Sequence, residues 1–215
     1  MSSHHFVKEG QEPALIIANG NACSYDLLTN IMEWCPFIVV LDGAYDRLLE
    51  MQIVPDVVIG DLDSLKAERN HQHIKFVQLE SQETTDLEKA IDYLSESGYD
   101  EINVLWATGN RLDHTLNNVA TLARYPKTRI VLYDDFSKCF LLPKSYKKHY
   151  DNGTALSLIP LPNAEGIVTS NMKYPLKNET LTYAKRSGTS NEVASDGIVE
   201  ITYISGLLAL IESRS

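Results

Sequence analysis

The chain of 215 residues has few cysteines and no long apolar run, and each shortage excludes a class of protein. Three cysteines, Cys23, Cys35 and Cys139, are an odd number without CxxC spacing, which argues against a disulfide framework or a zinc site. No stretch is apolar over the roughly 18 residues that a membrane span needs. The polar amino terminus lacks the apolar centre of a signal peptide. We therefore expect a cytoplasmic protein with reduced thiols and no membrane partner.

Positive charge is also scarce. The 19 Lys and Arg residues stand against 29 Asp and Glu, for a formal net charge of −10. Non-specific binding to nucleic acid needs a basic face, so nucleic acid is excluded as a partner. The glycine-rich nucleotide motifs GxGxxG and GxxxxGK[ST] are absent as well. A phosphate ligand stays possible, because a bound metal ion can reverse the local charge.

Apolar runs typical of buried strands recur over the first part of the chain, up to about residue 135. They lie at 14–20, 37–44, 55–65, 75–79, 101–107 and 129–135. Helical periodicity lies between several of them and is clearest over 81–98, where Thr85 and Glu88 fit a capping box and Gly98 fits a helix stop. Strands that alternate with helices predict a mostly parallel, three-layer α/β domain.

The pattern changes after Phe136. Short apolar or alternating runs follow, divided by Gly, Pro and Asn, and none has a helical period. This pattern is typical of an antiparallel β-sandwich. We expect two domains, an α/β catalytic domain at 1–137 and a β-sandwich at 138–215.

The stretch PDVVIGDLDSL, Pro55 to Leu65, ends an apolar strand in two aspartates. In an extended backbone Asp61 and Asp63 would project to one side, because side chains alternate with period two. Two neighbouring carboxylates repel each other unless a cation lies between them, and Mg²⁺ prefers such oxygen ligands. Taken alone, the pair could equally be a solvated acidic loop.

Further aspartates follow other predicted strands. Asp42 follows the second strand, Asp86 begins the helix at 81–98, and Asp113 begins a later helix. Each has a simpler explanation, namely a turn, a helix dipole contact and an N-cap respectively. Arg111 could pair with Asp113 or hold a phosphate. Because ligands bind outside the carboxyl ends of parallel strands, we expect the acidic groups to converge on one edge of the sheet.

The motifs DGAYDRL, PDVVIGDLDSL, TTDLEKAIDYL, GNRLDHTLNNV, LSLIPL and TSNEV, in that order, closely resemble the thiamine pyrophosphokinase family. The resemblance spans about Ala14 to Leu210. It implies an α/β nucleotide domain and a β-sandwich paired as a homodimer. It also implies transfer of the terminal pyrophosphoryl group of ATP to the hydroxyl of thiamine, giving thiamine diphosphate and AMP. The chain departs from the family where Trp106 and Asn110 stand in place of common glycines.

Matching positions in the motifs assign roles to residues of this chain. The resemblance implies a catalytic, Mg²⁺-bearing site of Asp42, Asp61, Asp63, Asp86 and Asp113. Either Asp86 or Asp113 would accept the proton of the alcohol, and the motifs do not say which. The residues implied to contact the nucleotide or thiamine are Asp42, Gly43, Thr85, Arg111, Asn118, Ser190 and Asn191. The thiamine pocket would lie between the α/β domain of one subunit and the β domain of the other.

Two other functions are consistent with an acidic site at a sheet edge. A metal-dependent phosphohydrolase would consume ATP without thiamine. A non-catalytic nucleotide sensor would bind ATP without turnover.

Overall fold

The computed structural model describes residues 12–63, 73–79 and 83–214. The polar amino-terminal segment and the first residues of the helix predicted at 81–98 lie outside these ranges. The chain forms two compact units. The first runs to Thr121 and includes Lys127–Asp134, and the second comprises Leu122–Pro126 and the residues from Asp135 onward.

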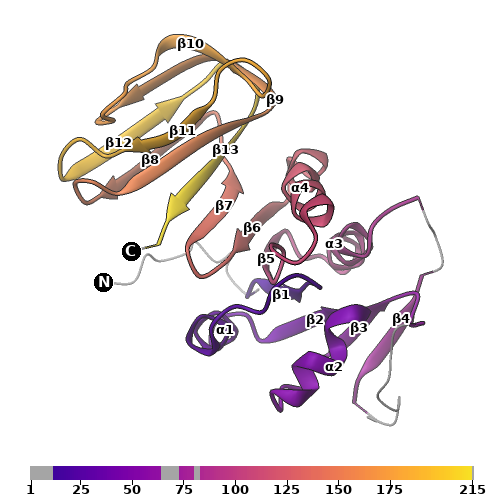
Figure 1. Ribbon diagram of the computed structural model, residues 1–215. Coiled ribbons are helices and arrows are strands. Elements are labelled where there is room, and N and C mark those ends of the chain that lie inside the picture. The colour runs from indigo at the N-terminus through magenta and orange to yellow at the C-terminus, as the bar shows by residue number, and fades with distance from the viewer. Residues whose placement is uncertain (1–11, 64–72, 80–82, 215) are drawn as a thin grey trace. The chain divides into compact units, whose positions relative to one another are not determined.

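The first unit is built on a parallel sheet with the strand order β4-β3-β2-β1-β5-β6 (Figure 1). Its strands are β1 (Ala14–Ile17), β2 (Phe37–Leu41), β3 (Val57–Gly60), β4 (Lys75–Gln78), β5 (Glu101–Leu105) and β6 (Arg129–Tyr133). Residues of β1 and β3 are buried throughout, as expected of strands that are covered on both faces. The chain moves outward from β1 to β4 and then returns to β5 on the other side of β1.

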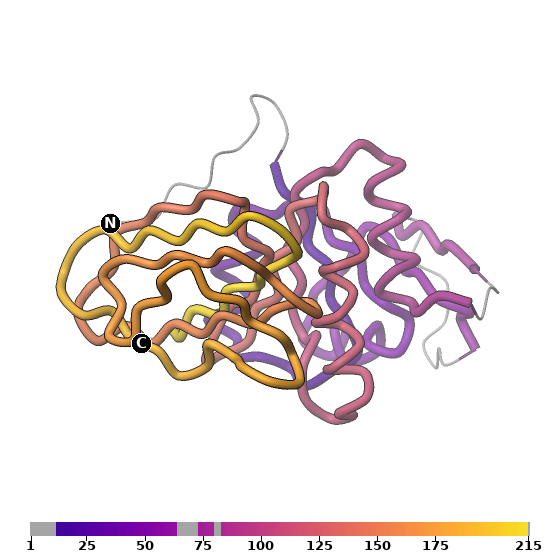
Figure 2. Tube along the Cα trace, turned by 90° about the horizontal axis from the view of Figure 1, so that it is seen from above, coloured from indigo at the N-terminus to yellow at the C-terminus, as the bar shows by residue number. Residues whose placement is uncertain are grey.

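Helices cover both faces of this sheet. They are α1 (Tyr25–Met32), α2 (Asp42–Glu50), α3 (Asp86–Glu96) and α4 (Leu112–Thr121), followed by the 3-10 turn η1 (Leu122–Arg124). Figure 1 shows α1 and α2 on one face and α3 and α4 on the other, and in Figure 2 the latter two lie over the strands. The predicted three-layer α/β arrangement is confirmed. The capping box of Thr85 and Glu88 is also confirmed at the start of α3.

Three local expectations were wrong. The helix α2 begins at Asp42, so Asp42 and Gly43 form its first turn instead of a separate turn. The helical spacing of Leu27, Ile31 and Trp34 predicts a helix that includes Trp34, but α1 ends at Met32. The apolar spacing of α4 predicts a buried face, yet Leu112 and Leu116 are 73% and 52% exposed.

The second unit is antiparallel, with the strand order β7-β13-β9-β12-β8 and with β10 and β11 also paired to β9. Its strands are β7 (Ser137–Leu141), β8 (Ser145–Tyr150), β9 (Ala155–Ser170), β10 (Lys177–Thr182), β11 (Gly188–Glu192), β12 (Gly197–Thr202) and β13 (Ser205–Ser213). This confirms the antiparallel β region. The sequence pattern predicts separate strands in TALSLIPLP and in GIVTSNMKYPL, but residues of both runs belong to the single long strand β9. Strand β8 was not predicted, because its alternating lysines and tyrosines are not apolar enough to stand out.

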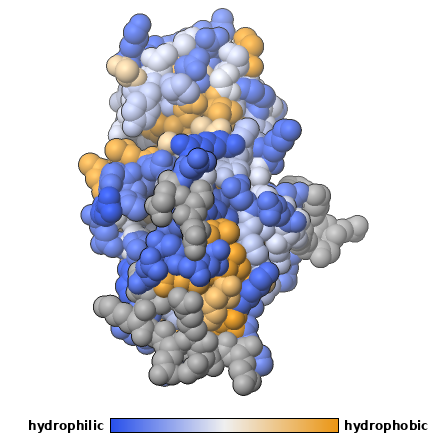
Figure 3. Space-filling model, turned by 90° about the vertical axis from the view of Figure 1, so that its right-hand side faces the viewer, coloured by the Kyte–Doolittle hydropathy of each residue, from blue (hydrophilic) through white to orange (hydrophobic). Residues whose placement is uncertain are grey.

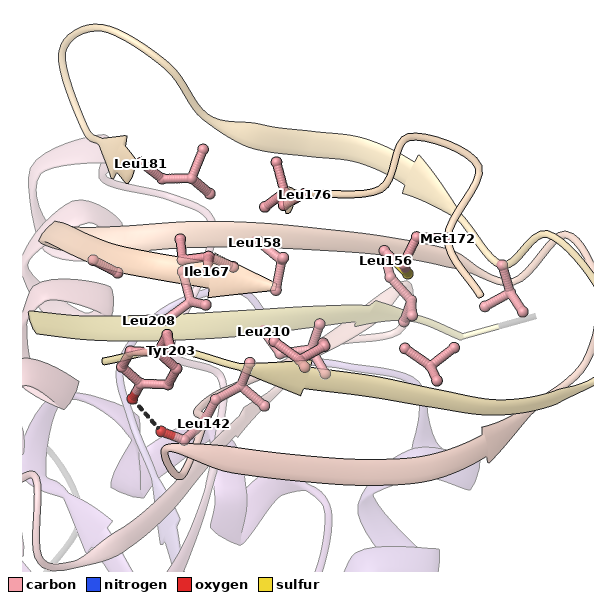
Figure 4. Close-up of a cluster of buried hydrophobic side chains, with 14 of the residues drawn as sticks. Leu142, Leu156, Leu158, Ile167, Met172, Leu176, Leu181, Tyr203, Leu208 and Leu210 are labelled. Atoms are coloured by element: carbon pink, nitrogen blue, oxygen red, sulfur yellow. Dashed lines mark hydrogen bonds between the residues drawn. The ribbon is translucent and has the colours of Figure 1, made fainter. Parts of the chain in front are cut away.

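The second unit has its own apolar core, drawn in Figure 4. Leu156 and Leu158 of β9 pack with Leu208 and Leu210 of β13, and all four are fully buried. Burying a leucine side chain stabilises a fold by about 1.5–3 kcal/mol, so this cluster is a main source of the unit's stability. The face of the molecule in Figure 3 is mostly hydrophilic, with several apolar patches between the polar residues.

A buried carboxylate, Glu212 of β13, joins three strands of this unit. It accepts hydrogen bonds from the hydroxyls of Tyr146 (3.0 Å) and Tyr150, and it pairs with Lys138 (3.0 Å) and Lys148 (2.8 Å). Burial alone would raise the pKa of Glu212, but the two ammonium groups and the hydroxyls outweigh burial, so its pKa is lowered. The ionised carboxylate therefore holds β7, β8 and β13 together.

Candidate functional site

Asp42 is the most buried of the predicted site residues that carry a charge, with 8% of its surface exposed. Its Oδ1 accepts a hydrogen bond from the N–H of Gly43 (2.6 Å) and its Oδ2 from the N–H of Leu62 (3.0 Å). A Cβ atom on Gly60 would lie 2.3 Å from the Asp42 carboxyl carbon. Because glycine has no side chain at this point, the end of β3 can lie directly against the carboxylate that begins α2.

Asp61 follows β3 and its side chain interacts with that of Asp42. Burial raises the pKa of Asp42, and the Asp61 side chain and the charge of Asp86 raise it further. The N–H of Asp63 and the interaction with Asp42 lower the pKa of Asp61, and the Lys89 charge adds to this. The start of α2, the loop after β3 and the first turn of α3 thus bring three of the predicted carboxylates together at one edge of the sheet.

Lys89 belongs to this group and was missed from the sequence. Its ammonium lies 2.9 Å from Asp86 Oδ1 and donates to the carbonyl of Leu79 (3.1 Å), with 7% of the residue exposed. Asp86 and Lys89 are three residues apart on α3, a spacing that brings side chains together on a helix. That spacing was visible in TDLEKA, and only the burial of the lysine depends on the fold.

The backbone around Asp63 is not extended, contrary to the expectation that placed Asp61 and Asp63 on one side. Leu62 between the two aspartates has a φ of 64°, so the backbone there is left-handed instead of extended. The N–H of Asp63 donates to Asp61 Oδ1 (3.1 Å), which closes a tight turn. A period-two argument therefore does not give the direction of the Asp63 side chain.

Arg111 and Asp113 form an exposed ion pair at the start of α4. The guanidinium donates from Nε to Oδ1 (3.1 Å) and from Nη2 to Oδ2 (2.5 Å), and the side chains are 69% and 64% exposed. These hydrogen bonds hold the pKa of Asp113 below its usual value. Asn118 lies further along α4, and its amide donates to the carbonyl of Ala107 (2.8 Å), fixing the loop after β5. In the described ranges, no hydrogen bond or ion pair joins this pair to Asp42 or Asp61.

Ser190 and Asn191 lie on β11, in the second unit. Ser190 has a φ of 57°, and its N–H donates to Ser157 Oγ (3.0 Å). The buried amide of Asn191 accepts from the N–H of Tyr174 (3.0 Å) and donates to its carbonyl (2.8 Å). Asn191 therefore supports the backbone, whereas the left-handed conformation at Ser190 is the kind of outlier that often accompanies a functional site.

The donor set suits a magnesium ion that is completed by substrate. In the part of the chain that the structure describes, no three His, Cys, Asp or Glu side chains stand in a geometry to hold a metal jointly. Asp42 and Asp61 nevertheless place two carboxyl groups in contact, which is unfavourable unless a proton or a cation lies between them. Mg²⁺ is commonly held by one or two carboxylates together with substrate phosphates and water. The residues present therefore fit Mg²⁺ bound with a polyphosphate.

Comparison with known proteins gives the same result in both units. Residues 28–133 match the family "Thiamin pyrophosphokinase, catalytic domain", and residues 145–208 match "Thiamin pyrophosphokinase, vitamin B1 binding domain". The chain is 34% identical to thiamine pyrophosphokinase 2 of Arabidopsis thaliana, across 95% of this chain and 88% of that protein. It is 32% identical to thiamine pyrophosphokinase 1 of rice, across 78% of this chain and 69% of that protein.

A solved structure agrees in fold as well as in sequence. The crystal structure of thiamine pyrophosphokinase from Bacillus subtilis is similar with a TM-score of 0.79 and 27% identity, across 95% of this chain and 100% of that one. Its similarity extends over nearly the whole chain, so it includes both the α/β unit and the antiparallel unit.

Proposed function

Because the chain belongs to the thiamine pyrophosphokinase family, we propose that its acidic sheet edge binds the magnesium complex of ATP. The activity itself follows from membership: the protein is an ATP-dependent thiamine diphosphokinase that transfers pyrophosphate from ATP to thiamine, releasing AMP. The matched relatives support neither a thiamine-independent phosphohydrolase nor a non-catalytic sensor.

The observation that carries the proposal is the position of Asp42 at the end of β3, where its Oδ2 accepts from the N–H of Leu62 (3.0 Å), the residue directly after Asp61. We assign Asp42 and Asp61, with Asp63, Asp86 and Asp113, to the magnesium site. Bound Mg²⁺ supplies positive charge that neutralises the triphosphate. Lys89 keeps Asp86 in place through its 2.9 Å contact and provides a fixed positive charge in an otherwise acidic group. Asp86 and Asp113 are the two candidates for the acceptor of the thiamine hydroxyl proton.

Neighbouring residues orient the substrates. Arg111 presents a planar guanidinium that can exchange its exposed carboxylate partner for two phosphate oxygens. Thr85 and Gly43 lie at the starts of α3 and α2. Their own N–H groups donate to Glu88 and Asp42, so we assign them to shaping these helix N-termini, which favour anions. Asn118 acts through the loop after β5, which its amide holds in place.

We propose that thiamine is bound with residues of the antiparallel unit and that two chains form a homodimer. Ser190 and Asn191 are the residues of that unit assigned to thiamine. The exposed Leu112 and Leu116 support an interface, because they are one turn apart on α4 and Leu112 directly follows Arg111 in the chain. A homodimer with a two-fold axis is the commonest assembly that would cover such a face.

A reducing, cytoplasmic location is part of the same proposal. Cys35 and Cys139 are buried and Cys23 is half-buried, and the three are not paired with one another in disulfides. None of the helices in the described ranges has the length and apolar character needed to cross a membrane. Free thiols are the rule where glutathione and thioredoxin keep cysteines reduced.

Two variants test the magnesium site. We expect Asp61→Asn and Asp63→Asn to abolish thiamine-dependent AMP release, because loss of one charged ligand weakens the metal site by several kcal/mol. Asp151→Asn, an exposed aspartate in the turn after β8, is the matched control and should keep wild-type turnover.

Magnesium titration of each variant separates weaker metal binding from unfolding, which circular dichroism detects. Binding of Mn²⁺ as a spectroscopic substitute for Mg²⁺ gives a readout that does not depend on turnover. Near-normal activity of both variants, with unchanged metal affinity, would refute the assignment.

A further inference from the structure

The loop after β1 continues the sheet past the end of the strand. The N–H of Ala18 donates to Leu105 O (2.9 Å), that of Gly20 to Trp106 O (2.6 Å) and that of Asn21 to Thr108 O (2.8 Å). A Cβ atom on Gly20 would lie 2.2 Å from the Thr108 carbonyl oxygen. Backbone hydrogen bonds therefore join the loops after β1 and β5, and only a glycine at position 20 permits so close an approach.

These two loops lie where the strand order of the sheet reverses. The chain leaves β1 through α1 on one face of the sheet and leaves β5 through α4 on the other (Figure 1). In open α/β sheets the ligand binds outside the carboxyl ends of the strands at this position. The segment Asn19–Asn21 was not among the residues selected from the sequence, yet it occupies that place.

Arg47 of α2 holds this segment. Its Nη1 donates to the carbonyl of Gly20 (2.9 Å) and its Nη2 to the side-chain oxygen of Asn19 (2.9 Å). Its guanidinium carbon lies 4.9 Å from the centre of the Trp106 ring, within range of a cation–π contact. One side chain thus ties α2 to the loops that follow β1 and β5.

Two features of Trp106 are energetically unfavourable, its backbone conformation and its buried indole nitrogen. Its φ is 57°, a conformation uncommon in residues other than glycine, asparagine and aspartate. It is 1% exposed, and its indole nitrogen has no hydrogen-bond partner among the residues that the structure describes. Strain and an unpaired buried donor both destabilise the fold, and they cluster at sites where function requires the conformation.

Asn19 also lies directly beside the acidic group. A Cβ atom on Gly43 would lie 2.1 Å from the amide nitrogen of Asn19, and Gly43 follows Asp42. Asp42 therefore has the Asn19 segment on one side and the end of β3 with Asp61 on the other. A nucleotide whose phosphates are held at these carboxylates would therefore have Asn19 as a close neighbour.

We propose that Arg47 is a positioning residue that fixes the loop Asn19–Asn21 as the binding element for the nucleoside end of ATP. This rests on the proposed function, because it takes the acidic edge as the site of the triphosphate. Arg47 acts through the loop and through Trp106. The two-pronged hydrogen bonding requires an arginine, since a lysine ammonium cannot span both acceptors while stacking on the ring.

The test measures ATP binding apart from turnover. In a Trp34→Phe background Trp106 is the sole tryptophan, and its fluorescence reports ATP titrated with Mg²⁺ in the absence of thiamine. We expect Arg47→Lys and Arg47→Met to raise the dissociation constant of ATP about tenfold or more, with the larger effect for methionine. The control is Arg129→Lys, which alters an exposed arginine at the opposite edge of the sheet and should change nothing.

Steady-state kinetics supply the second readout. The KM for ATP should rise in the Arg47 variants while the KM for thiamine stays unchanged. An unchanged ATP affinity, or an equal rise in both KM values, would overturn the proposal. Asn19→Asp covers the case in which Arg47→Met unfolds: it keeps an oxygen acceptor for Arg47 and places a negative charge in the loop proposed to bind ATP, so unchanged ATP affinity there would also overturn the proposal. The magnesium assignment is tested separately: an active Asp61→Asn variant would refute it, whatever the result for Arg47.

Discussion

A single methyl group at Gly60 should disable the site while leaving the fold largely intact. Gly60 ends β3, and its missing side chain leaves the space that the Asp42 carboxylate occupies. In Gly60→Ala the new Cβ would lie 2.3 Å from the carboxyl carbon and 2.4 Å from Oδ2. The Asp42 carboxylate is therefore the group that has to move.

The size of the effect follows from these distances. Ordinary contacts of a Cβ atom begin at 3.4 Å, so the carboxylate must shift by about 1 Å. That shift weakens the 3.0 Å hydrogen bond from the N–H of Leu62, which fixes the loop carrying Asp61. A misplacement of about 1 Å in a catalytic group costs on the order of 100-fold in rate. Overpacking one methyl group costs only about 1–3 kcal/mol of stability.

The assay is thiamine-dependent AMP release at saturating ATP and Mg²⁺, with a melting temperature for each protein. Gly153→Ala is the control, because Gly153 has a φ of +78° and open space around it. It should lose a similar stability, about 1–2 kcal/mol from backbone strain, without losing rate. If Gly60→Ala turns over within about threefold of wild type, Asp42 is not a site residue of the kind argued here.

Three further predictions concern other parts of the molecule. Arg111→Lys should lower the rate markedly more than the melting temperature, since an ammonium cannot replace the planar guanidinium toward phosphate; equal rates would make the exposed pair with Asp113 a surface contact only. A mixture of subunits carrying Asp63→Asn and a bulky change at Ser190 should recover activity, to about half of wild type per heterodimer, if each pocket uses two chains. No recovery after subunit exchange, followed by native mass spectrometry, would place each pocket within one chain. Glu212→Gln should cost about 3–5 kcal/mol near pH 7, because two ammonium groups lose their partner. Since the folded pKa of Glu212 is lowered, its stabilisation is present above the ordinary glutamate pKa and disappears as pH falls through the lowered value. The free energies of unfolding of the wild type and of Glu212→Gln should become equal across that acid range. A constant difference would contradict a stabilising role of the ionised carboxylate.

The layered fold could be predicted because its signals are local. The apolar runs of β1, β2 and β3 and the capping box at Thr85 depend on residues close together in the chain. The edge on which Asp42, Asp61 and Asp86 gather follows from strand direction alone. The expectation that Asp63 projects to the same side as Asp61 was wrong, because it assumed an extended backbone. Nothing in the sequence marks Leu62 as left-handed.

What could not be predicted depends on contacts between distant segments. Arg47 contacts Gly20 and Trp106, which lie 27 residues before it and in the loop after β5, and no local pattern links them. The apolar spacing of α4 is real, but burial of Leu112 depends on what covers the helix, and one chain does not cover it. Helical periodicity identifies an apolar face without identifying its partner.

Strand β9 sets the order in which the second unit can assemble. It pairs with β10, β11, β12 and β13, so a single strand is shared by four neighbours. During synthesis β9 is made well before β13, and until then its edge has unpaired N–H and C=O groups and apolar residues in the open. Pairings so distant in sequence form slowly, which prolongs that exposure. A translational pause or a premature stop before Ser205 would therefore leave the edge of β9 exposed. We expect such products to depend on chaperones or to aggregate.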